Sequence, residues 1–323
     1  MILEIVLIVV SIAVVLWGAD RFTDGASGLA RRLKVSELVI GLTVVALGTS
    51  LPEFMVSFMS VLRGSSDMSV GNIIGSNVFN ILVILGVSAI MRSMPVEKTL
   101  LRRDLPICLA FSVLLVTFAV TGDVIARWEG LLLVCCFCGY MYLAYRIAMQ
   151  DRKGLPASPK GEEIIASPEG EEKVEASLWR CLLLILVGMA ALVVGGKVLV
   201  DNAAAVAREW GISESVIGMT ILAGGTSLPE LATSVVAARK GSLGLAFGNV
   251  VGSNIFNIAF VVGTCGCIMP MPVTEITLID WVALIGSCIL LWLTALTSRR
   301  LSRGEGILLV CCYLSYLSLL LAR

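Results

Sequence analysis

Two glutamates lie inside long apolar stretches, where a charged side chain is costly and is therefore expected to have a function. Glu53 and Glu230 each follow a proline directly, and each sits well inside a long apolar stretch. A proline has no amide hydrogen, so it cannot bond the carbonyl four residues earlier and interrupts a helix at that point. An ionisable residue at the centre of a membrane-spanning helix costs roughly 2.5–3.5 kcal/mol. A broken helix that carries a buried carboxylate therefore has the outline of a cation site.

The surroundings of the two glutamates are copies of one another. Gly-Thr-Ser-Leu-Pro-Glu occupies 48–53 and returns at 225–230, and a Gly-Asn-x-x-Gly-Ser-Asn-x-Phe-Asn-Ile motif occupies 71–81 and returns at 248–258. Both motifs recur after 177 residues. A proline kink satisfied within its own helix would explain one copy, but it does not easily explain two copies that carry the same glutamate. The duplication therefore favours a functional site.

Neutral oxygen atoms accompany both carboxylates. Hydroxyl groups precede the glutamates in the broken turns, and a serine and two asparagines recur at intervals of four in the next helix, which places them on one face. These residues are Thr49, Ser50, Thr226 and Ser227 in the turns, and Asn72, Ser76, Asn80, Asn249, Ser253 and Asn257 on the helix faces. Asn77 and Asn254 point about 100° away from the neighbouring serines, as expected of residues that bridge helices. An all-oxygen set with two carboxylates suits a hard cation such as Ca²⁺.

The composition requires a membrane around these residues. Hydrophobic residues make up 58% of the 323-residue chain, charged residues make up 15%, and the mean hydropathy is +0.96. The apolar stretches are long enough to cross a hydrocarbon core of about 30 Å as helices. The zero net charge gives no indication of a nucleic-acid partner. The absence of histidine removes histidine-based catalysis and zinc-protease motifs, and no nucleophile-base pair appears in the core, so an enzyme is disfavoured.

The pattern predicts an all-α polytopic membrane protein with ten transmembrane helices. The predicted spans are 2–30, 36–62, 68–91, 104–121, 128–149, 178–206, 213–238, 243–269, 276–297 and 305–321. The duplication extends over both halves, so each half holds five spans, and an odd number threads the second half in the opposite sense. We therefore expect a first five-helix repeat at 1–149 and a second, inverted five-helix repeat at 178–323, which is the plan of many secondary transporters. Residues 150–177, rich in Pro, Gly, Glu and Lys, are predicted to form a cytoplasmic linker.

The basic residues predict the orientation. Eighteen Lys and Arg residues fall in connections on one side of the predicted spans, and four fall on the other side. Because basic residues accumulate in cytoplasmic loops, both termini are expected to be extracytoplasmic. The chain is expected to reside in a plasma membrane, the inner membrane of a prokaryotic cell. The lipid bilayer is its expected surroundings, and no obligatory protein partner and no cofactor are expected.

The paired motifs closely resemble the two α-repeats of the sodium/calcium exchangers in the cation/calcium antiporter superfamily. The resemblance covers nearly the whole chain and is strongest at 36–90 and 213–267. It implies exchange of transported Ca²⁺ for Na⁺, with Glu53 and Glu230 as central calcium ligands. By the same resemblance the carbonyls of Thr49 and Thr226 assist them and Asn80 and Asn257 complete the centre. The residues implied to line sodium sites are Ala46, Ser50, Ser76, Ala223, Ser227 and Ser253.

Two alternatives remain at this stage. The same glutamates could exchange protons for calcium, and a cation channel is a different class, although inverted repeats around a closed site favour alternating access. Some relatives, notably potassium-dependent exchangers, carry Asp where this chain has Asn257. The neutral residue argues against potassium co-transport and leaves the ion ratio open.

Overall fold

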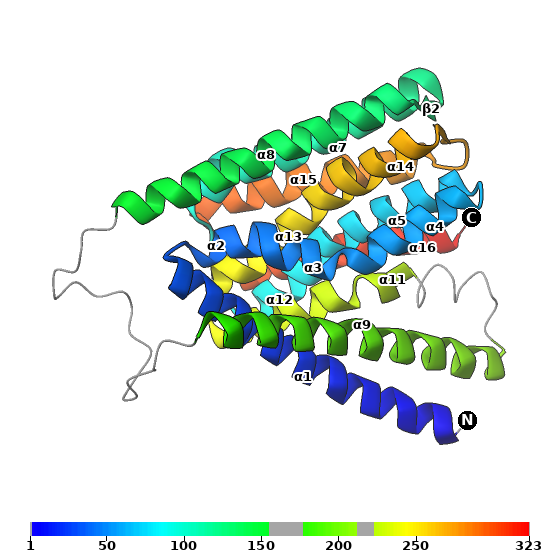
Figure 1. The fold of residues 1–323 in the computed structure, drawn as a ribbon. Coiled ribbons are helices and arrows are strands. Elements are labelled where there is room, and N and C mark those ends of the chain that lie inside the picture. The colour runs from blue at the N-terminus through cyan, green and yellow to red at the C-terminus, as the bar shows by residue number, and fades with distance from the viewer. Residues whose placement is uncertain (1, 155–176, 212–222, 323) are drawn as a thin grey trace, which may run out of the picture.

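A computed structural model describes residues 2–154, 177–211 and 223–322. Helices dominate it, and four two-residue strands join some of their ends (Figure 1). The elements are α1 (Ile2–Leu33), α2 (Glu37–Ile40), η1 (Gly41–Val45), α3 (Ala46–Thr49), α4 (Leu51–Leu62), α5 (Ser66–Phe79), η2 (Asn80–Leu85), α6 (Gly86–Met91), β1 (Met94–Pro95), η3 (Leu100–Asp104), α7 (Leu105–Gly122), β2 (Val124–Ile125), α8 (Arg127–Gly154), α9 (Leu178–Glu209), α11 (Ala223–Thr226), α12 (Leu228–Lys240), α13 (Leu243–Ile255), η5 (Phe256–Val262), α14 (Gly263–Ile268), β3 (Met271–Pro272), α15 (Leu278–Ser298), β4 (Arg300–Leu301) and α16 (Arg303–Leu321).

The membrane-spanning character is confirmed for most of the predicted spans. Within the described residues, eight helices are long and apolar enough to cross a membrane, or nine if the bent pair formed by 37–49 and 51–62 is one span. The predicted span 213–238 cannot be followed as a whole, because residues 212–222 lie outside the described part of the chain. Its second half is α12. The predicted linker also lies outside that part at 155–176, and α8 extends five residues into the predicted linker range.

The helices break where the prolines predict. The first broken helix bends by 45° between Thr49 and Leu51. In the second copy α11 ends at Thr226 and α12 begins at Leu228. Ser50 and Ser227 join the halves with nearly identical backbone angles, φ −85° with ψ 9° and φ −85° with ψ 8°. The two copies therefore share one local geometry, because each proline removes the same backbone hydrogen bond.

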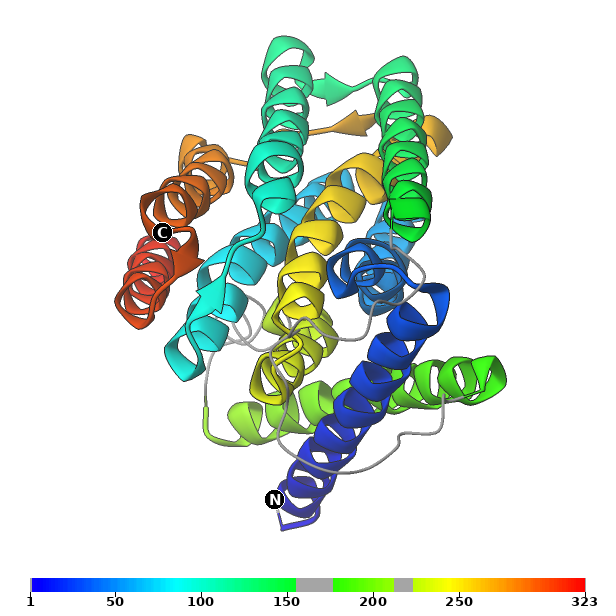
Figure 2. The same ribbon diagram turned by 90° about the vertical axis from the view of Figure 1, so that its left-hand side faces the viewer.

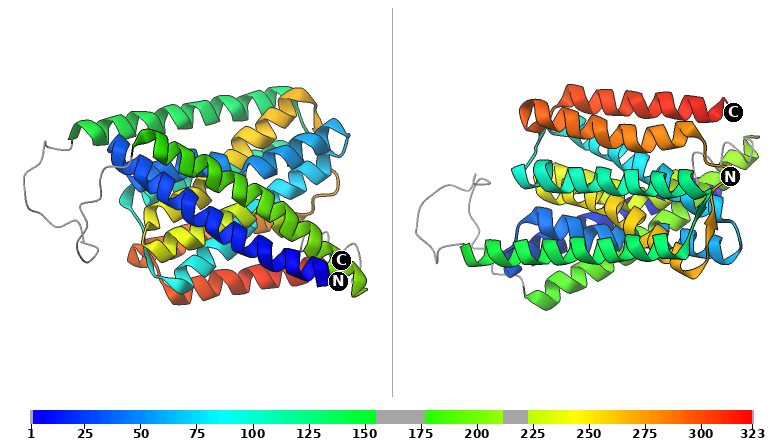
Figure 3. Two further views of the ribbon diagram at one scale, coloured as in Figure 1. Left: turned by 60° about the horizontal axis from the view of Figure 1, so that its bottom comes forward. Right: turned by 90° about the horizontal axis from the view of Figure 1, so that it is seen from above.

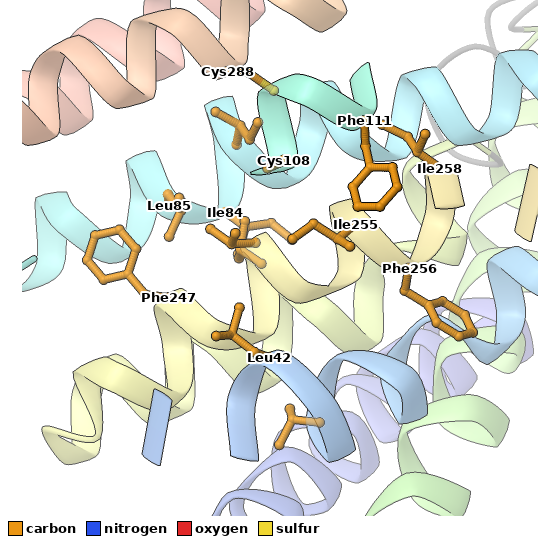
Figure 4. Close-up of a cluster of buried hydrophobic side chains, with 14 of the residues drawn as sticks. Leu42, Ile84, Leu85, Cys108, Phe111, Phe247, Ile255, Phe256, Ile258 and Cys288 are labelled. Atoms are coloured by element: carbon orange, nitrogen blue, oxygen red, sulfur yellow. The ribbon is translucent and has the colours of Figure 1, made fainter. Parts of the chain in front are cut away.

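Two continuous spans cross at the centre of the molecule. One is α5–η2–α6 and the other is α13–η5–α14, and they are the most buried of the candidate spans. They run in opposite directions, and the broken helices pack beside them (Figures 1 and 2). Figure 4 shows Ile84 and Leu85 of η2 among α13 side chains such as Phe247 and Ile255. The apolar core thus surrounds the region where the repeated polar residues lie.

Close approach at glycines brings α13 against the first broken helix. A Cβ on Gly248 would lie 2.6 Å from the Leu38 carbonyl oxygen, and one on Gly252 would lie 2.7 Å from the Leu42 Cα. These distances are too short for any side chain, so the backbones themselves are in contact. The small-residue pattern at these two positions therefore performs the packing role that it has in membrane helices.

The outer elements of each half pack against elements of the other half. Helix α8 packs on α14, and α16 packs on α6. Strand β1 pairs with β4, and β2 pairs with β3. These contacts form equivalent pairs, because the repeat relates α8–α14 to α16–α6 and β1–β4 to β2–β3. The two strand pairs lie at opposite ends of the bundle, because β1 precedes the helix η3–α7 and β2 follows it.

Helices α1 and α9 form a separate pair against the core (Figure 3). They touch backbone to backbone, since a Cβ on Gly188 would lie 2.7 Å from the Gly18 carbonyl oxygen. The beginning of α1 and the end of α16 lie at one end of the bundle. The end of α8 and the beginning of α9 lie at the other (Figure 1).

Candidate functional site

The two glutamates start the second halves of the broken helices. Glu53 lies in the first turn of α4 and Glu230 in the first turn of α12, and both are completely buried. The positive end of a helix dipole lies at each of these positions and favours a carboxylate there. Each glutamate accepts a hydrogen bond from the serine three residues before the other glutamate, so the two carboxylates share one region of the core. The structure thus brings together two residues that are 177 positions apart.

Each carboxylate is held by the broken turn of the other half. The Ser227 hydroxyl donates to Glu53 Oε1 at 3.0 Å, and the Ser50 hydroxyl donates to Glu230 Oε1 at 2.8 Å. Both serines are completely buried. Hydroxyl groups that donate to a carboxylate stabilise its charged form. They also make each half of the site depend on the other half.

Four asparagines form a reciprocal network between the two central spans. The Asn77 amide nitrogen donates to the Asn254 carbonyl oxygen at 3.1 Å, and Asn254 returns the same bond at 3.1 Å. The amide nitrogens of Asn80 and Asn257 donate to Asn254 Oδ1 at 3.0 Å and to Asn77 Oδ1 at 3.1 Å. The bridging expected of Asn77 and Asn254 is confirmed. The network also fixes the orientation of Asn80 and Asn257, because it engages their nitrogens and leaves their Oδ1 atoms free.

Irregular backbone occurs where these last two asparagines lie. Asn80 is the first residue of the π-helical segment η2, and Asn257 is the second residue of η5. Such segments are rare and occur often at functional sites.

Five buried oxygen atoms of the predicted site have no hydrogen-bond partner within the described residues. They are Glu53 Oε2, Glu230 Oε2, Asn80 Oδ1, Asn257 Oδ1 and Ser76 Oγ. Each unpaired buried polar atom costs about 1–3 kcal/mol, and more where it carries charge. Ca²⁺ takes six to eight oxygen ligands and Na⁺ is likewise an oxygen-seeking cation. The donor chemistry therefore fits a hard cation that these atoms would surround.

The remaining predicted residues fall around this centre. Thr49 Oγ1 donates to Asn249 Oδ1 at 3.0 Å, and Thr226 Oγ1 donates to Asn72 Oδ1 at 3.5 Å. The Ser253 hydroxyl lies 3.4 Å from the Ala46 carbonyl oxygen, beside the closely packed α13. Asn72 and Asn249 thus tether the broken helices through their threonines, a role that spacing along one helix could not show.

Ala223 is the first residue of α11. Its assignment to a sodium site stays a prediction.

A cavity of about 780 Å³ leads to one side of the site. Pro52, Pro229, Asn72 and Thr226 line the part of it beside the glutamates. Across from α4 and α5, its wall is formed by α9 and includes Lys197 and Asp201. Within the described residues no three His, Cys, Asp or Glu side chains cluster to hold a metal. Glu53 and Glu230 are the carboxylates that the described residues supply to the predicted site.

Comparison with known proteins identifies the family. A model of the sodium/calcium exchanger protein family matches residues 3–146 and 181–322, which include both copies of the repeat. The chain belongs to this sodium/calcium exchanger family. The resemblance carried by the two motifs is thereby confirmed, and the chain is a multi-pass membrane transporter of the cation/calcium antiporter type.

Individual relatives match along nearly their whole length. The chain is 33% identical to the sodium/calcium exchanger MaX1 of Methanosarcina acetivorans over 94% of both proteins. It is 36% identical to the inner membrane protein YrbG of Escherichia coli over 99% of this chain and 97% of the relative. The solved structure of the sodium-calcium exchanger NCX_Mj matches with a TM-score of 0.82 at 30% identity, over 98% of both chains.

Proposed function

We propose that the protein exchanges calcium for sodium across the membrane by alternating access, with Glu53 and Glu230 as the central cation ligands. The observation that carries this proposal is the set of five buried, unpaired oxygen atoms contributed by both halves, two of which belong to the carboxylates of Glu53 and Glu230. Family membership and the likeness to MaX1 and NCX_Mj support the choice of ions.

The charge of the site explains why calcium and sodium can replace one another. Two carboxylates give a formal charge of −2, which one Ca²⁺ or two Na⁺ ions balance. A buried carboxylate pair without a cation is costly, because each charge has lost its water. The site is then stable when either ion fills it and unstable when it is empty, and that difference couples the two fluxes. We assign sodium ligation to Ser50, Ser227, Ser76, Ser253 and the Ala46 and Ala223 carbonyls, and calcium ligation to both glutamates with the Thr49 and Thr226 carbonyls and the Asn80 and Asn257 amides.

We further propose that ten spans form two inverted five-helix repeats, 1–149 and 178–323. The exchanged packing of α8 with α14 and α16 with α6 supports a two-fold relation between the halves. The strand pairs β1–β4 and β2–β3 support an axis parallel to the membrane plane, since they are equivalent by the repeat and lie at opposite ends of α7. An inverted pair of repeats places the shared site near the midplane.

We place both termini on the extracytoplasmic side of a prokaryotic inner membrane and residues 150–177 in the cytoplasm. The Lys and Arg distribution supports this orientation. Labelling of a Ser167→Cys variant by an impermeant thiol reagent tests it. Reaction from the outside of intact cells would contradict the orientation.

The deciding experiment is calcium uptake by the purified protein in proteoliposomes. We expect uptake when the vesicles are loaded with sodium and diluted into sodium-free medium, and no uptake when sodium is equal on both sides. A pH gradient imposed without sodium separates the proton-coupled alternative. If a pH gradient drives uptake and sodium has no effect, the coupling ion is the proton, and the same glutamates carry it.

A further inference from the structure

A lysine at the end of α12 ties α1 to the core at one end of the bundle. Lys240 Nζ lies 2.7 Å from Asp20 Oδ1 and 2.7 Å from Asp24 Oδ1. It also donates to the Asp20 carbonyl oxygen at 3.1 Å. The two aspartates are one turn apart on α1, so a single ammonium group bridges both. We name Lys240, Asp20 and Asp24 the α1 clamp.

Other contacts close the same end. The Ser27 and Ser242 hydroxyls lie 3.1 Å apart, and the Ser242 hydroxyl donates to Glu37 Oε1 at 3.0 Å. Thr23 of α1 and Thr233 of α12 are 1% and 0% exposed, and their hydroxyls have no partner among the described residues. Helix α1 therefore covers the face of α12 that leads from this end to Glu230.

The repeat assigns a counterpart at the opposite end to each of these residues. An offset of 177 relates Lys240 to Arg63, Asp24 to Asp201, and Asp20 to Lys197. Within the described residues neither Arg63 nor Asp201 forms an ion pair. Cavities of about 450 Å³ and 780 Å³ occupy the space that the α1 contacts fill at the first end, and their walls include Arg63 and Asp201. Among the described residues, α1 thus closes one end, and a cavity occupies the equivalent place between α9 and α4 at the other.

We propose that the α1 clamp and the pair Arg63–Asp201 are alternating gates. In the conformation described, the α1 clamp is formed and the path along α4 and α9 is open. In the opposite conformation α9 closes on α4, Arg63 meets Asp201, and the α1 clamp separates. This proposal rests on the alternating access proposed above, in which two related halves exchange conformations around a fixed site. It adds the charged residues that hold each closed end together.

The two gates differ in strength. At the α1 clamp two carboxylates face two positive groups, Lys240 and Arg21, whose guanidinium lies 3.9 Å from Asp20 Oδ2. At the other end Arg63 would meet the single carboxylate of Asp201 with Lys197 close by, because Lys197 stands where the first half has Asp20. A second positive charge weakens the attraction between Arg63 and Asp201. The chain therefore biases the protein toward the conformation that keeps the α1 end closed. By the proposed orientation that end is cytoplasmic.

The expected size of the bias follows from exposure. The side chains of Lys240, Asp20 and Asp24 are 30%, 39% and 45% exposed. Exposed ion pairs have small effects, although networks of several charges have larger ones. Loss of the clamp should shift the conformational equilibrium about threefold to tenfold.

The test uses one reporter cysteine on each path, in a background whose native cysteines are replaced and whose transport is retained. Thr233→Cys reports the α1 end, and its counterpart Val56→Cys reports the open cavity. The measured quantity is the rate of modification by an impermeant thiol reagent, applied to proteoliposomes of known orientation. We expect Lys240→Gln to accelerate modification at 233 about threefold to tenfold and to slow it at 56. Arg239→Gln is the matched control, because Arg239 has the same charge and forms no hydrogen bond or ion pair with α1 in the described part of the chain; it should change neither rate.

The reciprocal variant decides between a gate and a loosened fold. Arg63→Gln should slow modification at 233 and leave position 56 as reactive as before or more so. Exchanging the charges, Lys240→Glu with Asp24→Lys, should return both rates toward the unsubstituted values. Unchanged rates in Lys240→Gln, or faster modification at both positions, would overturn the proposal. Sodium-driven calcium uptake by the unsubstituted protein tests the transport function separately, so failure of the gates and failure of the function are distinguishable.

Discussion

The two halves of the molecule agree at the centre and diverge along α1 and α9. At the centre each residue of the site has an identical counterpart in the other half: Glu53 and Glu230, Ser50 and Ser227, Asn80 and Asn257. The equivalent hydrogen bonds differ in length by no more than 0.2 Å, at 2.8 and 3.0 Å for the serines and 3.0 and 3.1 Å for the asparagines. On the flanking pair of helices Asp20 corresponds to Lys197 and Thr23 to Val200. In the proposed mechanism one site binds the same ions from both sides, and that requirement would restrain the centre. The flanking helices would only set which side is open, so their residues would be free to differ.

This difference implies two kinds of mutational effect. A change at the centre should lower transport and ion affinity whichever side is open. A change on α1, α9 or their contacts should redistribute the protein between conformations and leave the ion chemistry intact. The following predictions test that division, beginning with the largest effect.

Replacing either central glutamate should nearly abolish exchange. Glu53→Gln and Glu230→Gln each preserve shape and remove one of the two carboxylates of the centre, so calcium would no longer be balanced. We expect sodium-driven calcium uptake to fall at least about 100-fold, in line with the loss of a charged hydrogen-bonding group worth more than about 2.7 kcal/mol. Glu275→Gln is the control, because Glu275 is exposed. Substantial uptake by either core variant would remove these glutamates from the site.

Removing a bridging asparagine should weaken calcium binding without removing a proposed ligand. Asn77→Ala deletes the Oδ1 that holds the Asn257 nitrogen and the amide that bonds the Asn254 carbonyl. Groups that orient a ligand typically change metal affinity 10- to 100-fold. Calcium affinity measured by isothermal titration should fall within that range. Asn202→Ala, at a side chain that bonds only the Val198 carbonyl, should have no such effect.

Introducing a third carboxylate should change the coupling ions. Asn257→Asp adds a negative charge that demands a compensating cation, so calcium binding should be retained or tightened while dependence on sodium or potassium changes. The substitution also places an acceptor against Asn77 Oδ1, where an amide nitrogen now donates at 3.1 Å. Some stability should therefore be lost, about 1–3 kcal/mol for an unpaired buried acceptor.

The measurement is calcium uptake at a fixed sodium gradient with the membrane potential clamped and potassium present or absent. The unsubstituted protein should be indifferent to potassium. A potassium requirement before the substitution would contradict the neutral role assigned to Asn257.

The smallest effect should come from making the flanking helices alike. Lys197→Asp gives α9 the two carboxylates that α1 has, so the gate formed with Arg63 should strengthen. The rate of thiol modification at the Thr233→Cys reporter should increase about twofold to tenfold, while the calcium affinity stays unchanged. Lys98→Asp, at an exposed position outside both gates, is the control. A change in affinity with no change at the reporter would show that Lys197 acts on the ions and not on the conformation.

Much of the centre was predictable because its sequence motifs occur twice in the chain. Proline before glutamate in two apolar stretches predicted two broken helices, and both breaks are present at Ser50 and Ser227. Spacing by four placed Ser76 and Asn80 on one helical face. The bridging role of Asn77 followed from its direction on the helix, and the structure confirms it. These predictions succeeded because helical geometry converts sequence spacing into direction.

Other features depended on which helices meet. The sequence put Ser50 in the same turn as Glu53, but its hydroxyl bonds Glu230 in the other half. Asn72 and Asn249 share the face of the serines, yet their oxygens accept from threonines of the broken helices. Lys240 counted only as one basic residue among the loops, although it bridges two aspartates of α1. Pairings across more than 150 residues follow from packing, which no local spacing encodes.

The sequence by itself thus determined the membrane class, the duplication, the breaks and the oxygen-rich residue set, since each depends on composition or on local backbone chemistry. Tertiary structure alone decided which oxygen atoms remain unpaired, which half holds which carboxylate, and which end is closed. Those properties arise where two distant segments compete for the same hydrogen bonds and the same space. The unpaired atoms of Glu53, Glu230, Asn80, Asn257 and Ser76 are the oxygen atoms of the centre that this packing leaves without a partner among the described residues.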